Sequence, residues 1–381
     1  MKKRIRWSGV KSFSICAAAI LLFSTAAFAQ YVRTDLVSNQ PGVAPNTDAA
    51  HLVNGWGLAS LAKTPFWVSD NGTGFSTLYN ATGQQSHLFV TIPPAPGSPE
   101  GTLGTPTGVV GNISPNANDF TVTEAGRSGK TLFIFATLDG TISGWNAVVA
   151  GVNRGTGATH ATPAANRSHD GASYSGLAIG EATIEDKTQF LLYAADDGPN
   201  RRVDVFDANF HLMNLPTTST GPAFTDPQIP RDFAPYGIQN IKGDIWVTYT
   251  ALNKAQSGFV DRFASDGTLK QHSAVRGPLH SPWGLAQAPD NFGPMSNAIL
   301  VTNNTSRGRI NAFDATTGEF LGPLLDASGN AIEIDNIWAI QFGQGTSASS
   351  PGPNGTTNQL FFTAGPNGYA NGLFGVINVG P

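Results

Sequence analysis

Six copies of a short phrase place aromatic side chains at one repeated position, and aromatic rings can stack on a sugar face or another planar ligand. The phrase is an aromatic or small residue, then glycine, then apolar residues, with Ala339 replacing the glycine in the last copy. The residues before the glycine are Trp56, Thr107, Ser175, Tyr236, Trp283 and Trp338. Asn54 and Asn336 precede Trp56 and Trp338 by two residues and would add amide contacts. The four aromatic and two amide residues are therefore candidate ligand-binding residues.

The same aromatic position has a second interpretation. Three of the seven tryptophans share it, and large rings brought to one place can fill a central channel and pack beneath their neighbours without touching a ligand. Residue types alone do not separate a binding platform from a packed plug. Both interpretations stay open at the level of sequence.

Carboxylate and amide side chains follow a second set of apolar runs. Asp70, Asp196 and Asn303 end three of these runs, and oxygen ligands of this kind can hold Ca²⁺. Asp and Asn also cap tight turns by bonding to nearby backbone, and Gly72 and Gly198 favour that interpretation. We expect no cofactor, with Ca²⁺ at these three residues as the alternative.

Recognisable catalytic motifs are missing from the sequence. The seven histidines show no His-x-His or His-Glu-x-x-His spacing for zinc, and no glycine-rich loop has the context that phosphate binding needs. His160, His169, Asp170 and Ser173 share a stretch that could hold a hydrolytic site, but its Gly, Ala and Thr content is typical of a solvated loop. The sequence therefore favours a protein that is not an enzyme.

The elements that would position these residues are short strands. Each phrase is followed by an apolar run, such as 66–70, and then often by an alternating run, such as 202–207. Alternation with a period of two, bounded by Asn, Asp and Gly, is typical of strands and hairpins. The 44 glycines and the charged fraction of only 13% exclude a helical bundle or coiled coil. We predict an all-β, six-bladed β-propeller of four-stranded blades, as a single domain over residues 30–381.

The two ends of this domain are expected to close the ring. The last repeat has a third strand at 373–379 and then stops at Pro381. The segment 31–37 can supply the missing fourth strand, which would leave no free sheet edge between the ends.

The repeats resemble those of NHL-type six-bladed propellers, whose unit has a Gly-Ile-Ala-like, a Tyr-Val-Ala-Asp-like and an Arg-Val-x-x-Phe-like strand. Three longer phrases, 54–58, 66–72 and 360–368, also resemble a bacterial family of secreted proteins associated with exosortase (PEP-CTERM) sorting. The C-terminal sorting helix and basic tail of sorted proteins are missing from this sequence. The resemblance implies the propeller fold and little about function.

The first 29 residues have the pattern of a secretory signal peptide. Five basic residues begin it, an apolar run covers 15–28, and Ala27-Phe28-Ala29 predicts cleavage after Ala29. That run is shorter than the roughly 20 residues that span a membrane, and no later run reaches 18 residues. We expect a secreted or periplasmic protein with no membrane span after cleavage.

The charge balance limits the partners. Without the signal peptide, 17 basic residues face 26 acidic ones, a formal charge of −9. Nucleic-acid binding needs clustered Lys and Arg, so this balance argues against it. The low charge content and the closed ring predict a monomer.

Long connections are expected on the face where the inner strands begin, which we term the loop-rich face. Loops on a rigid scaffold commonly carry binding residues. We therefore predict an exported binding module for a glycan or a protein on this face. The alternative is a metal-dependent (Ca²⁺ or Zn²⁺) hydrolase or lactonase. Six-bladed lactonases hold their metal with carboxylates on inner strands, and none of the residues before the repeated glycine is a carboxylate.

Overall fold

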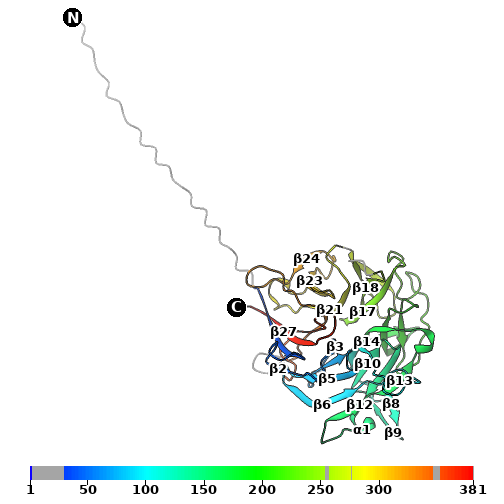
Figure 1. The fold of residues 1–381 in the computed structure, drawn as a ribbon. Helices are drawn as coiled ribbons and strands as arrows, with labels where there is room; N and C mark the ends of the chain where they lie inside the picture. The colour runs from blue at the N-terminus through cyan, green and yellow to red at the C-terminus, as the bar shows by residue number, and fades with distance from the viewer. Residues whose placement is uncertain (2–29, 254–256, 276, 346–351, 381) are drawn as a thin grey trace.

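Six small sheets form a ring around a central axis, as Figure 1 shows. This computed structural model describes residues 1, 30–253, 257–275, 277–345 and 352–380. The all-β, six-bladed β-propeller predicted from the repeats is confirmed. The predicted signal peptide, apart from Met1, lies outside the described residues.

Each blade begins with an inner strand that carries the repeated phrase. The inner strands of blades one to six are β3 (Gly55–Ala59), β7 (Pro106–Gly111), β14 (Tyr174–Ile184), β17 (Phe233–Ile241), β21 (Pro282–Gln287) and β25 (Ile337–Phe342). Adjacent inner strands contact one another around the whole ring, and β25 contacts β3. The repeated phrase therefore surrounds the central channel.

The runs that follow each phrase form the next two strands. The second strands are β4 (Phe66–Asp70), β10 (Phe133–Thr137), β15 (Lys187–Asp196), β18 (Asp244–Ala251), β22 (Ile299–Asn303) and β26 (Leu360–Ala364). The third strands are β5 (Phe75–Tyr79), β11 (Thr141–Trp145), β16 (Arg202–Phe206), β19 (Gly258–Phe263), β23 (Ile310–Phe313) and β27 (Leu373–Val379). Most of their residues are buried, because both faces of a blade pack on neighbouring blades.

The outer strands are less regular than the prediction of four strands per blade. Blades one, two, four and five have the fourth strands β6 (Gln85–Thr91), β13 (Thr162–Asn166), β20 (Leu269–Val275) and β24 (Phe320–Pro323). Blade three is a sheet of three strands, with a single bridge from Phe206 to Leu212 beyond β16.

The connections between the strands of blade two hold structure that the sequence did not indicate. A hairpin of β8 (Thr121–Glu124) and β9 (Arg127–Lys130) packs beside α1 (Ala147–Ala150). Strand β12 (Ala158–His160) pairs with β6 of blade one. The stretch 151–174 is therefore not the plain loop that its composition indicated. In the part of the chain that the structure describes, no helix is long and apolar enough to cross a membrane.

The ring closes where the sequence predicted. Strand β1 (Tyr31–Ser38) pairs antiparallel with β27, from Tyr31 opposite Val379 to Ser38 opposite Leu373. Figure 1 shows this blue strand beside the red C-terminal one. The short β2 (Asn46–Thr47) extends the same sheet. Blade six is thus built from both ends of the domain.

The repeated glycine is required because inner strands approach each other closely. A Cβ atom added at Gly237 would lie 1.9 Å from the carbonyl oxygen of Trp283, and one at Gly57 would lie 2.1 Å from that of Thr107. Real Cβ contacts are never this short, so any side chain would push two blades apart.

A hydroxyl group stabilises each of four inner strands near this glycine. In blade four, Gly237 donates its N–H to Thr248 Oγ1 at 2.8 Å, and in blade five Gly284 donates to Thr302 Oγ1 at 2.8 Å. In blades two and three the phrase supplies the hydroxyl itself, because Thr107 and Ser175 donate to carbonyl oxygens of the next blade. The small residues at the repeated position therefore connect blades.

Candidate functional site

The four predicted aromatic residues meet at the centre of the ring, and we term them the aromatic plug. The indoles of Trp56 and Trp338 stack with ring centroids 3.6 Å apart and planes 16° apart. Trp283 lies edge-on to Trp56 at 6.4 Å, and Tyr236 lies 5.9 Å from Trp338. The four residues come from blades one, four, five and six, so only the closed ring brings them together.

The tryptophans of the plug are buried, whereas Tyr236 is partly exposed. Trp338 is 1% exposed, Trp56 6% and Trp283 8%. The Trp338 indole donates to Asn54 Oδ1 at 2.8 Å, and that of Trp283 donates to the Ser175 carbonyl at 2.9 Å. Below the plug, the channel holds a cavity of about 40 Å³, which is room for roughly one water molecule. A larger ligand could contact the plug only at its outer edge.

The two predicted amide residues shape the mouth of the channel. Asn54 and Asn336 have φ angles of 49° and 48°, in the left-handed region that Asn tolerates better than most residues. Asn54 Nδ2 donates to Asn71 Oδ1 at 3.2 Å, and Asn336 Nδ2 donates to the Gly365 carbonyl at 3.2 Å. Both side chains are buried and hold neighbouring loops, and a direct ligand contact for them stays a prediction.

Tyr369, which the sequence did not single out, joins the outer edge of the plug, and Asp197, which follows the predicted Asp196 on the chain, contributes to its electrostatics. The Tyr369 ring lies 5.5 Å from that of Trp338, is 40% exposed, and donates its hydroxyl to Asn304 Oδ1 at 2.6 Å. Burial raises the pKa of the Asp197 carboxyl to about 6. Burial raises the pKa of Tyr236, and Tyr369 and Asp197 raise it further through their charges.

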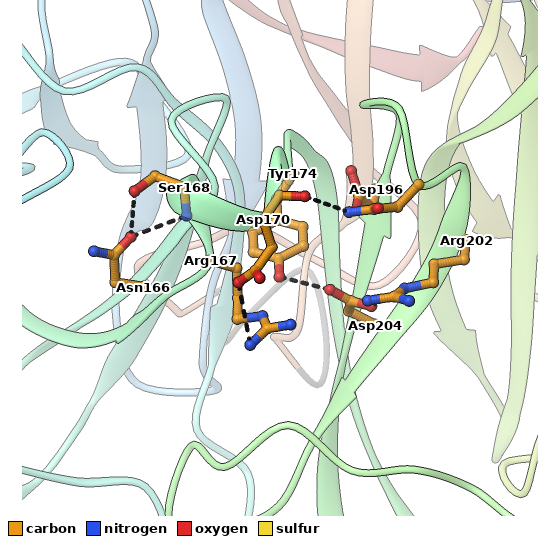
Figure 2. Close-up of polar contacts among 9 residues, drawn as sticks. Asn166, Arg167, Ser168, Asp170, Tyr174, Asp196, Arg202 and Asp204 are labelled. Atoms are coloured by element: carbon orange, nitrogen blue, oxygen red, sulfur yellow. Dashed lines mark hydrogen bonds and ion pairs between the residues drawn. The ribbon is translucent and has the colours of Figure 1, made fainter.

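The predicted Ca²⁺ ligands lie at equivalent positions on three different blades. Asp196 accepts hydrogen bonds from the backbone of Ser173 and Gly198 and from Asn200, and Figure 2 shows it beside that turn. Asn303 holds the loop before β21 by accepting from His280 N and donating to the Pro278 carbonyl. Their polar atoms serve turns within their own blades. A cation at Asp196 or Asn303 stays a prediction.

Asp70 is the exception among these residues. Both of its carboxylate oxygens are buried and have no hydrogen-bond partner among the described residues. Burial raises the pKa of this carboxyl well above its usual range. Burial therefore disfavours the charged form of Asp70 relative to an exposed carboxyl, and its role as a metal ligand stays a prediction.

The stretch with His160, Asp170 and Ser173 does not form a nucleophile–base pair through His160. His160 Nε2 lies 2.7 Å from Glu124 Oε2 on strand β8, and Asp170 pairs with Arg167 at 3.3 Å. Figure 2 shows Asp170 and Arg167 on the 3₁₀ turn η1 (Ser168–Asp170) and the residue before it.

A buried cluster in blade four brings together three side chains that the sequence did not connect. Asp226 precedes β17, Asp261 lies on β19 and His272 on β20, and their ligand atoms all lie within 4.8 Å of one another. His272 Nδ1 is 2.6 Å from Asp261 Oδ1 and 2.8 Å from Asp226 Oδ2. Both carboxylate side chains are 0% exposed, and the imidazole is 12% exposed. With the neighbouring Tyr249, we term this set the blade-four cluster.

Local structure fixes the positions of these residues. In the β19–β20 hairpin, Asp261 and His272 are directly opposite partners, so their side chains share one face. Gly267 has a φ of +87° in the connecting turn, where Thr268 N donates to Asp266 Oδ1 at 2.8 Å. A slip of one residue would send Asp261 to the opposite face.

The loop that carries Asp226 is attached to the same turn. Phe224 N donates to the Gly267 carbonyl at 2.8 Å, and Gln228 N donates to Asp226 Oδ1 at 2.8 Å. Counting outward from the Asp266-Gly267 turn would have paired Asp261 with His272. No local signal indicated Asp226, which joins them through tertiary contacts.

The electrostatics of the cluster show the effect of burial. Burial raises the pKa of Asp261 to about 6, although His272 opposes the shift. The hydrogen bond to Asp261 raises the pKa of His272, and burial and both carboxylates raise that of Tyr249. The cluster thus holds two carboxyl groups, one imidazole and one phenol where water has little access.

A cavity of about 320 Å³ lies beside the cluster, between blades three and four. Asp226 and Tyr249 line it, together with Arg201, Arg202 and Arg231. Arg202 Nε donates to Asp204 Oδ1 at 2.6 Å, and Arg201 Nη1 donates to the Arg231 carbonyl at 2.7 Å. The cavity has room for a small molecule, and its wall combines buried acidic groups with cationic ones.

Comparison with known proteins supplies relatives but no activity. No family model matches the chain. An uncharacterised protein of Acanthamoeba polyphaga mimivirus is 29% identical over 353 residues, covering 89% of this chain and 83% of its own. A second uncharacterised protein of the same virus is 30% identical over 263 residues, covering 62% of this chain and 46% of its own. Neither name states a function.

Several solved structures match most of the chain at low identity. A glucose dehydrogenase is 14% identical with a TM-score of 0.49, and the match covers 92% of this chain and 99% of that one. A virginiamycin B lyase from Staphylococcus aureus is 10% identical with a TM-score of 0.44, over 92% and 99% of the two chains. These similarities carry no information about a substrate or ligand of this protein.

Proposed function

We propose that the protein is an exported binding module that holds a glycan on its loop-rich face, over the outer edge of the aromatic plug. The observation that carries the proposal is the exposed part of the plug, where the rings of Tyr369 and the partly exposed Tyr236 lie 5.5 and 5.9 Å from that of Trp338, and where Asp197 raises the pKa of Tyr236. Aromatic rings stack on the apolar faces of sugars, and a carboxylate accepts hydrogen bonds from sugar hydroxyls.

The buried part of the plug would serve as support. Trp56 and Trp338 stack on each other, and Trp338 packs against Tyr369 on the outer side. A rigid aromatic base reduces the entropy that Tyr236 and Tyr369 lose when a ligand binds. In this proposal, Asn54 and Asn336 act by holding the loops of the mouth.

A glycan array tests the proposal. We expect the wild-type protein to bind at least one glycan class, and Tyr236→Ala and Tyr369→Ala to weaken that binding at least about fivefold, since aromatic contacts contribute about 1 kcal/mol or more. Phe320→Ala is the control, because Phe320 is an exposed ring, 43% accessible, on the outer strand of blade five. Trp283→Ala and Trp338→Ala are less informative, since they remove buried packing.

Two results would contradict the glycan proposal. Wild-type protein that binds nothing on the array would argue for a protein partner, which affinity capture with wild type and Tyr369→Ala would then test. Binding that both tyrosine variants retain would place the ligand elsewhere on the molecule.

Export is part of the same proposal. The predicted signal peptide would release a mature chain that begins at Gln30, is monomeric and acts in the periplasm or outside the cell. Intact-mass analysis of the exported protein tests the cleavage after Ala29, and light scattering tests the monomer. The association with exosortase sorting rests on the three sequence phrases alone.

A further inference from the structure

The blade-four cluster is short of hydrogen-bond donors. His272 Nδ1 lies within 2.8 Å of both Asp226 and Asp261, but one N–H can donate fully to only one of them. Asp226 Oδ2 is buried and makes only this shared contact with the imidazole, and Asp261 is buried next to the Tyr249 hydroxyl, so at most two side-chain donors serve the two carboxylates of the cluster. Buried carboxylates normally accept several hydrogen bonds, so this shortage of donors indicates a missing partner.

The cluster is also short of positive charge. Even with His272 protonated, two carboxylates would leave a net charge of −1 in a buried site. In the part of the chain that the structure describes, neither carboxylate forms an ion pair with a lysine or arginine. The nearby Arg202 is paired with Asp204. Burying an uncompensated charge is costly unless a cation accompanies it.

We propose that Asp226, Asp261 and His272 form a binding site for a divalent transition-metal ion, with Zn²⁺ as the ion that fits the donor set. One imidazole nitrogen and two carboxylates are typical zinc ligands, whereas Ca²⁺ and Mg²⁺ prefer oxygen ligands alone. A bound Zn²⁺ would replace the proton shared by His272 and the carboxylates, and would neutralise both negative charges.

The distances between the ligand atoms of the cluster are close to those of a tetrahedral zinc site. Zinc bonds of about 2.0–2.2 Å in a tetrahedral site put ligand atoms roughly 3.3 Å apart. The two separations from His272 Nδ1 are 2.6 and 2.8 Å, and all three ligand atoms lie within 4.8 Å of one another. Side-chain rotations that lengthen the two separations from His272 by about 0.5–0.7 Å would accommodate the ion.

The fourth coordination position has room on the cavity side. Asp226 and Tyr249 line the cavity of about 320 Å³, so a water molecule or a small anionic ligand could complete the shell from there. An open position beside a cavity distinguishes catalytic zinc sites from closed structural ones. The inference does not rest on the proposed glycan binding, which concerns the centre of the ring.

Metal titration tests the site directly. The full chain, purified and freed of metal with a chelator, is titrated with Zn²⁺ by calorimetry, and its Tm is measured with and without the ion. We expect one Zn²⁺ per chain and a raised Tm, since an ion that binds only the folded state stabilises it. Asp261→Asn and His272→Gln should weaken binding at least about 100-fold, because even outer-shell changes cost 10–100-fold.

The control variants are Asp290→Asn and His211→Gln, which remove the same chemical groups from exposed positions of the chain. Far-UV circular dichroism of the metal-free variants separates loss of binding from loss of fold. Binding that Asp261→Asn and His272→Gln retain would overturn the proposal, and so would a wild-type protein that binds no Zn²⁺.

Crystals soaked in Zn²⁺ provide a measurement that needs no variant. An anomalous peak about 2.0–2.2 Å from the ligand atoms of all three residues would support the site. A peak only at other residues would overturn it. Glycan binding that persists in metal-free protein would leave the proposed function intact, so the two ideas can fail separately.

Discussion

In the aromatic plug, Trp56 and Trp338 lie with ring centroids 3.6 Å apart, whereas in the blade-four cluster two carboxylates converge on one imidazole. Both sets are buried and both combine residues distant in sequence. The plug gains stability from burial, because apolar rings lose contact with water and two of the indoles donate hydrogen bonds. The cluster loses stability from burial, because its charges and oxygens are not fully compensated.

By this difference, the aromatic plug is a packed structural centre, whereas the blade-four cluster has the properties of a binding site. In the plug, Trp56 Nε1 is buried without a hydrogen-bond partner among the described residues, but the plug carries no buried charge that a ligand would have to compensate. The cluster does hold such charge, because two buried carboxylates share one imidazole beside a cavity. The plug therefore supports a ligand only at its exposed edge, and the cluster supports one in its interior.

The largest expected effect is the loss of stability when the centre of the plug is removed. Trp338→Ala should lower the free energy of unfolding by about 3–5 kcal/mol, because a large buried ring is lost and Asn54 Oδ1 loses its donor. Urea unfolding followed by circular dichroism measures the change. Tyr369→Ala, at a 40% exposed ring, is the control and should cost less than about 1 kcal/mol. Equal losses would contradict the distinction between a buried plug and its exposed edge.

The second effect concerns the strands around the plug. Gly237→Ala should cost about 1–3 kcal/mol, because the new Cβ would meet the Trp283 carbonyl and push blades four and five apart. Gly155→Ala is the matched control, since its nearest neighbour is a side-chain atom at 3.4 Å. If both variants unfold at the same urea concentration, close packing of inner strands is not what selects glycine.

The third effect is a pH dependence at the edge of the plug. The pKa of Asp197 is raised to about 6, so the folded state holds its proton where the unfolded state has lost it. This contribution to stability is present below about pH 4 and is lost as the pH rises to about 6. In Asp197→Asn, the decrease in unfolding free energy across that window should shrink by roughly 1–3 kcal/mol.

Urea midpoints at pH 4 and pH 7 measure this dependence. Asp290→Asn, at an exposed position, should behave as the wild type does. An Asp197→Asn protein with the wild-type dependence would mean that solvent screens this carboxyl.

The smallest expected effect is the change in stability when a carboxylate of the blade-four cluster is removed. In metal-free protein at pH 7, Asp261→Asn should change stability by less than about 1 kcal/mol in either direction, because it removes one of two neighbouring buried charges and keeps the shape. The same urea unfolding measures it. If Asp261→Asn instead lowers the free energy of unfolding by about 3–5 kcal/mol, the carboxylate and imidazole form a compensated buried ion pair. The cluster would then be stabilised by its own contacts, as the plug is.

Much of the fold could be predicted from local patterns. The repeated phrase gave six inner strands, and the apolar runs gave their partners, because strand alternation and turn residues act over a few positions. The missing fourth strand of blade three and the added β12 could not be predicted, because outer strands have few buried neighbours and depend on nearby loops.

The candidate sites divide in the same way. The convergence of Trp56, Tyr236, Trp283 and Trp338 could be predicted because the repeat places equivalent residues on the channel. The burial that removes Trp56 and Trp338 from direct ligand contact depends on how four rings of different blades pack together.

The amino-acid sequence by itself determined the number of blades, the closure of the ring by β1 and the aromatic character of its centre. These follow from periodicity and from glycine, whose lack of a Cβ lets inner strands approach. Only the tertiary structure placed Asp226 against Asp261 and His272. Contacts between a loop and a hairpin decide that meeting, since 35 residues separate the two aspartates and no local rule encodes the distance between their carboxylates.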